Sequence, residues 1–66
     1  MPAKKLFVKI IGTGISERFE AISHEVRSYD ATLYHVFELA NGAELWFNDF
    51  GVRTLTLADN ERALDQ

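Results

Sequence analysis

The sequence predicts a single small α+β domain, in which one helix packs on a mostly antiparallel sheet in the order β-α-β-β-β. Three observations predict this fold: an apolar run near the start, a helical spacing of apolar residues between positions 15 and 29, and an Asn-Gly turn between two alternating segments. The 66 residues contain no linker and no repeat, so we expect one domain over residues 1–66.

The first expected strand covers residues 5–11. Its apolar residues are partly β-branched and are followed at once by Gly12-Thr13-Gly14, which is typical of a short buried strand ending in a turn. These glycines lie where a phosphate-binding loop would lie, but a third glycine and a Walker lysine are both missing. We therefore expect a turn here and no cofactor site.

The next segment, residues 17–29, is expected to be an amphipathic helix. Its apolar side chains recur at intervals of four, three, four and three and fall within an arc of about 80 degrees on a helical wheel: Ile15, Phe19, Ile22, Val26 and Tyr29. Ser16 is a suitable N-cap, Glu17 is near the expected start, and Arg27 is near the expected end, all in agreement with the helix dipole.

The second half is expected to be a three-stranded meander over residues 33–40, 43–48 and 52–57, with a turn at Asp49-Phe50-Gly51. A two-residue type I′ turn at Asn41-Gly42 would pair Phe37 with Trp46. With that register one face carries Tyr34, Val36, Leu45 and Phe47, and the other carries Leu33, Phe37, Leu39 and Trp46.

Apolar side chains on both faces of the hairpin are unusual in so short a chain. One helix can cover only one face, and at roughly 25 cal/mol per Å² an exposed second face would forgo several kcal/mol. A second copy of the chain, a binding target, or closure of the sheet into a barrel would each cover it.

The barrel is the alternative fold, because the second half resembles the later strands of an SH3-like or Tudor-like barrel. The residues that carry this resemblance are Tyr29-Asp30, Tyr34, Val36, Asn41-Gly42, Glu44, Trp46, Arg53 and Leu55. The resemblance covers about half the chain and requires residues 18–28 to be extended.

Charge and composition exclude several classes of protein. The net charge is -3, and residues 34–66 carry two Lys or Arg against six Asp or Glu, which argues against a phosphate-rich partner. There is no cysteine, so disulfides and thiolate chemistry are excluded. The apolar run near the start is interrupted by Lys9 and is shorter than the roughly 20 residues that span a bilayer. We expect a cytoplasmic protein without membrane contact.

Catalytic and metal-binding patterns are weak. Glu20 and His24 have the spacing of two ligands on one helical face, but no third ligand is identifiable. Ser16, His24 and Asp30 include the residue types of a nucleophilic triad but would be spread along the expected helix. We expect no enzyme activity, metal, cofactor or small-molecule substrate.

The expected function is that of a non-enzymatic protein-protein interaction module, either an inhibitor or adaptor of another protein or a homodimer. The expected partner-binding residues lie on the uncovered sheet face, because Trp is enriched at interface hot spots: Trp46, Phe37 and Leu39, rimmed by His35 and Glu44. The alternative is a nucleic-acid-binding regulatory protein that uses Lys4, Lys5 and Lys9.

Overall fold

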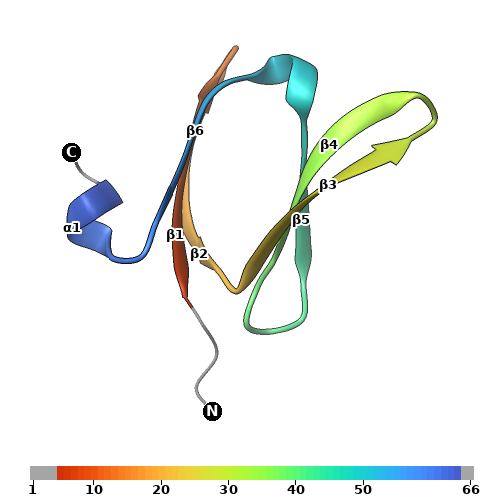
Figure 1. Cartoon of the computed structure of the whole chain (residues 1–66). Coiled ribbons are helices and arrows are strands. Elements are labelled where there is room, and N and C mark those ends of the chain that lie inside the picture. Colours follow the sequence, from red (N-terminus) through yellow and green to blue (C-terminus); the bar gives the residue numbers. More distant parts are fainter. Residues whose placement is uncertain (1–4, 65–66) are drawn as a thin grey trace.

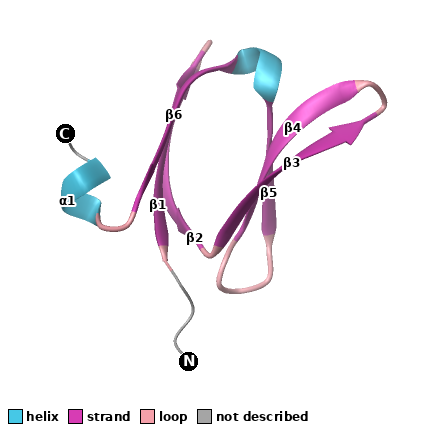
Figure 2. Ribbon diagram, in the orientation of Figure 1, coloured by secondary structure: helices cyan, strands magenta, loops and turns pink. Residues whose placement is uncertain are grey.

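The computed structural model describes residues 5–64 and contains two three-stranded antiparallel sheets, ordered β2-β1-β6 and β3-β4-β5 (Figure 1). The strands are β1 (Leu6–Gly12), β2 (Ile15–Ala21), β3 (Ser23–Tyr29), β4 (Thr32–Glu38), β5 (Glu44–Asn48) and β6 (Val52–Ala58). Two short helices, η1 (Asp49–Gly51) and α1 (Glu61–Leu64), flank β6 (Figure 2). The prediction of a small, mostly antiparallel domain with a helix is thus confirmed in outline.

The predicted helix over residues 17–29 is wrong, because this segment forms β2 and β3. The chain leaves one sheet and enters the other at Ile22, whose N–H donates to the Glu38 carbonyl at 2.8 Å. The inward-facing positions are odd-numbered in β2, as at Phe19, and even-numbered in β3, as at His24. The extended backbone that the barrel alternative required over residues 18–28 is therefore present, apart from the junction at Ile22.

The sheet that contains β1 differs from the prediction in its partners. β1 is the central strand and pairs antiparallel with β2 on one side and β6 on the other. The predicted helical crossover from β1 into the meander is consequently wrong, and β6 does not pair with β5. Val8 and Ile10 of β1 are completely buried, beside Leu57 and Leu55 of β6.

The β4–β5 hairpin closes one position away from the predicted register. The Leu39 N–H donates to the Ala43 carbonyl at 2.8 Å, and the Gly42 N–H donates to the Leu39 carbonyl at 2.9 Å. With Gly42 at φ 89°, this is a three-residue loop with glycine in the left-handed region. Val36 therefore lies opposite Trp46, and the predicted pairing of Phe37 with Trp46 is wrong. A one-position shift moves every side chain of one strand to the other face relative to its partner.

A two-residue turn with positive φ at both positions does occur, but in the β3–β4 hairpin. Asp30 and Ala31 have φ values of 52° and 63° between the paired residues Tyr29 and Thr32. These angles match the type I′ turn that the sequence predicted at Asn41-Gly42. The β3–β4 hairpin extends past the rest of its sheet (Figure 1).

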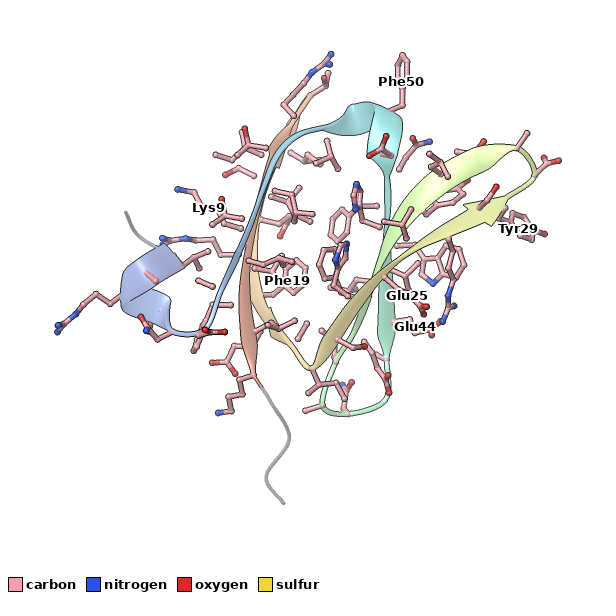
Figure 3. All side chains as sticks on the ribbon, in the orientation of Figure 1. Lys9, Phe19, Glu25, Tyr29, Glu44 and Phe50 are labelled. Carbon is pink, nitrogen blue, oxygen red and sulfur yellow. The ribbon has the colours of Figure 1, made fainter. Side chains whose placement is uncertain are left out.

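The hydrophobic core lies between the two sheets. Its buried cluster consists of Val8, Ile10, Ala21 and Phe37. The Phe19 ring, which lies between the sheets in Figure 3, meets Phe37 edge to face at 5.1 Å between centroids and stacks on Phe47 at 5.8 Å. The Phe37 face is thus covered by strands of the same chain, so of the three coverings considered from the sequence neither a second copy nor a binding target is needed there.

The C-terminal part of the described chain returns to the first sheet. Asn48 caps η1 by accepting the Phe50 N–H at 2.8 Å, and the chain then enters β6. Asn60 accepts the Ala63 N–H at 2.8 Å at the start of α1, which contacts β1 and β6 and buries Leu64. Neither helix within residues 5–64 is long and apolar enough to cross a bilayer.

Candidate functional site

The structure separates the residues that the sequence placed on one binding face. Trp46 and Glu44 lie on the outer face of the β3-β4-β5 sheet, because they alternate along β5 with Leu45 and Phe47, which pack against the core. Phe37 is fully buried, Leu39 packs against the core cluster, and His35 lies on the inner face with its side chain 14% exposed. Of the predicted set, only Trp46 and Glu44 are together on an open surface.

The outer face of this sheet carries a cluster that we call the Trp46 surface: Trp46, Tyr34, Arg27, Glu25 and Glu44. Strand register assembles it, because each residue is on the outward phase of β3, β4 or β5. Val36 lies between them, paired with both Glu25 and Trp46, and is only 2% exposed. The surrounding long side chains therefore cover Val36 while remaining accessible themselves.

The indole of Trp46 is held by three neighbours. Tyr34 meets it edge to face at 5.5 Å between centroids, and the Arg27 guanidinium carbon lies 5.5 Å from the ring centroid. The indole Nε1–H donates to Glu44 Oε1 at 3.3 Å. Trp46 is nevertheless 42% exposed, so an aromatic side chain with three defined neighbours faces solvent.

The charges of the Trp46 surface favour an approaching cation. Arg27 forms ion pairs with Glu25 and with Glu44, the latter at 3.6 Å between Nη1 and Oε2. The hydrogen bond to Glu25 is the main cause of the raised pKa of Arg27. Glu38, directly opposite Glu44 in register, adds a further carboxylate. Three carboxylates thus accompany one guanidinium, and the excess charge is negative.

Sequence reasoning missed Arg27 and Tyr34 as members of this surface. Arg27 was assigned to the end of a helix, and Tyr34 was assigned to the face opposite Trp46. The usable signal was the alternation of Glu25, Arg27 and Tyr29 with His24, Val26 and Ser28, which is what a strand with one charged face shows.

A second cluster of polar side chains lies on the inner face, at the end of the core. His24 Nε2 is 3.1 Å from His35 Nδ1, and His35 Nε2 is 2.7 Å from Asp49 Oδ1. The His24 ring also stacks on Phe37 at 4.8 Å between centroids. If His35 donates from Nε2 to Asp49, its Nδ1 accepts the proton of His24. Two imidazolium rings would have only donors to offer, so this bond is incompatible with protonation of both rings.

We expect His24 to make the stability of the domain depend on pH. Partial burial, followed by the proximity of His35, lowers the pKa of His24 below 6.5. The unfolded chain then binds more protons than the folded chain as the pH falls through 6.5, so the free energy of unfolding should be lower at pH 5.5 than at pH 7.5. Urea unfolding of the wild type and of H24Q at both pH values measures this.

In the H24Q variant the free energy of unfolding should differ less between pH 7.5 and pH 5.5 than in the wild type, because glutamine does not titrate. The variant serves as its own control across pH, since any general loss of packing lowers its stability at both values. An equal difference between pH 7.5 and pH 5.5 in both proteins would contradict the role of His24.

Other chemistry suggested by the sequence is not assembled. Glu20 and His24 lie on different strands, and within residues 5–64 no three His, Cys, Asp or Glu side chains are grouped to hold a metal ion. Lys5 lies 4.0 Å from Glu20 at a highly exposed position, Lys9 lies on the outer face of β1, and Lys4 is outside the described residues. The nucleic-acid alternative stays a prediction.

No family model, curated protein or solved structure matches the chain.

Proposed function

We propose that this protein is a non-enzymatic protein-protein interaction module and that its Trp46 surface binds a basic segment of a partner protein. The observation that supports this most is the position of Arg27, which the chain holds over the indole of Trp46 and between Glu25 and Glu44. The surface thus accommodates a guanidinium group with both aromatic and carboxylate contacts. A partner that brings Lys or Arg meets the same chemistry.

The energetics favour such a partner. A cation over an aromatic ring contributes about 0.5–1 kcal/mol at an exposed site and about 2 kcal/mol once water is excluded. A bound segment would exclude water from Trp46, which is partly exposed in the free protein. The carboxylates of Glu25, Glu38 and Glu44 outnumber Arg27, so an incoming cation need not displace it. In this role the protein acts as an adaptor or an inhibitor.

A defined peptide tests this proposal. Trp46 is the only tryptophan, so its fluorescence reports on the surface directly. A peptide of alternating Arg and Leu should change the emission of Trp46, whereas a peptide of alternating Glu and Leu at the same concentrations should not. The double variant E25Q/E44Q should bind the basic peptide at least about tenfold more weakly, a change of about 1.4 kcal/mol.

The matched control is E17Q/E61Q, which removes the same charge from exposed positions on β2 and α1. We expect its affinity for the basic peptide to stay within about twofold of the wild type, because these carboxylates are not part of the Trp46 surface. Absence of a fluorescence response, or equal losses in both double variants, would refute the proposed site.

A further inference from the structure

The opposite side of the molecule carries two adjacent basic side chains. On the outer face of the β2-β1-β6 sheet, Lys9 of β1 lies directly opposite Arg18 of β2. Glu20 is the only carboxylate that these three strands place on this face within the described residues, and β6 contributes Thr54 and Thr56 to it. We call this the Lys9 face. In Figure 3 Lys9 points away from the core on one side, and Glu25 and Glu44 lie on the other.

The Lys9 face also has an apolar component. Phe7 and Ile11 are on the same outward phase as Lys9, and Ile11 is 40% exposed. A groove beside α1 is lined by the apolar Phe7 and Leu64 and by the charged Arg18, Glu20 and Glu61, so α1 adds a second carboxylate next to this face. A projecting aromatic ring flanked by carboxylates would find both apolar contact and cations here.

We propose that a second copy of this chain is a partner of the Trp46 surface, and that the surface docks on the Lys9 face of that copy. This inference rests on the proposed function and names the partner. The argument is charge complementarity: Glu25 and Glu44 surround the exposed indole on one side of the molecule, and Lys9 and Arg18 are adjacent on the other. Complementary potentials both speed encounter and fix orientation.

The geometry determines the kind of assembly. The two surfaces differ and lie on opposite sides of the molecule, so the contact is head to tail and not two-fold symmetric. A protomer that uses its Trp46 surface keeps its Lys9 face available for a third copy. Association should therefore continue beyond a dimer, and it should weaken as salt screens the charges.

Two single variants and their mixture test this arrangement by sedimentation velocity over a concentration series. In the wild type the mean mass should rise past that of a dimer at low salt and fall at high salt. K9E, which damages only the Lys9 face, and W46A, which damages only the Trp46 surface, should each associate at least about tenfold more weakly. Mixed at equal concentration they should form a dimer that does not grow, because each contributes one intact surface.

Circular dichroism establishes that each variant is folded, and E25Q/E44Q replaces W46A if the latter is not. A wild type that is monomeric at all concentrations would overturn the inference, as would a K9E protein that still forms dimers or a mixture that does not associate. The Arg-Leu peptide separates failure of this inference from failure of the proposed function. If the protein is monomeric but binds the peptide, the proposed function stands with another protein as the partner. If the protein does not bind the peptide, the proposed site is wrong as well.

Discussion

Replacing Phe37 with alanine is expected to lower the free energy of unfolding by about 3–5 kcal/mol, which would leave little of the folded protein in a domain whose total stability is on the order of 5 kcal/mol. Phe37 is fully buried and its ring contacts Phe19, Phe47 and His24, so truncation leaves a cavity bounded by both sheets. Urea denaturation followed by circular dichroism measures the loss.

Phe50 provides the matched control, because the same substitution there removes a ring that is 86% exposed. We expect F50A to change stability by no more than about 0.5 kcal/mol. If F37A unfolded with a midpoint close to that of F50A, Phe37 would not be at the centre of the core, and the described packing of the two sheets would be wrong.

Gly12→Ala is expected to lower the free energy of unfolding by about 3 kcal/mol, the largest effect after that of Phe37→Ala. A Cβ atom at position 12 would overlap the carbonyl oxygen of Gly51 and lie 3.1 Å from Ile15 Cγ1. The Gly51 carbonyl also accepts the Thr13 N–H at 3.1 Å, and the β1–β6 register shifts at this point. The backbone must therefore move where η1 leads into β6, and thermal unfolding of the variant measures the effect.

The variant G14A is the control that separates the effect of steric crowding from that of backbone strain. The φ of Gly14 is 74°, but no atom lies within 4 Å of an added Cβ. The free energy of unfolding of G14A should therefore fall only by the cost of placing alanine in the left-handed region, about 1 kcal/mol. If G12A were no less stable than G14A, the close approach of β1 to Gly51 would be disproved.

Residues 17–29 have a helical spacing of apolar side chains and yet form two strands, and a change in the phase of alternation accounts for this. Inward residues alternate in β2 and again in β3, but the phase changes at Ile22, where the chain passes to the other sheet. This change produces the spacing of three between Phe19 and Ile22 and of four between Ile22 and Val26, which a helical wheel accepts. A pattern of period two with one shift is thus hard to distinguish from period 3.6 over so few residues.

The strands at either end were predictable, because the apolar run of β1 and the alternation of β6 need no knowledge of their partners. The candidate site was predictable only in part. The positions of Trp46 and Glu44 follow from strand β5 alone. Their neighbours depend on the register of the β4–β5 hairpin, which differs by one position from the predicted register. An Asn-Gly pair is compatible with both a two-residue and a three-residue loop, so the local pattern does not decide between the two registers.

The pairing of β1 with β6 has a consequence for how the chain acquires its structure. Val8 lies beside Leu57, far along the sequence, whereas every strand pair of the β3-β4-β5 sheet is joined by a short hairpin. Closing a long loop costs more entropy than closing a short one, and contacts between distant residues slow folding. The short hairpins, β1–β2 included, should consequently gain protection from hydrogen exchange before β6 does, and the pairing of β6 with β1 should be the slow step of folding.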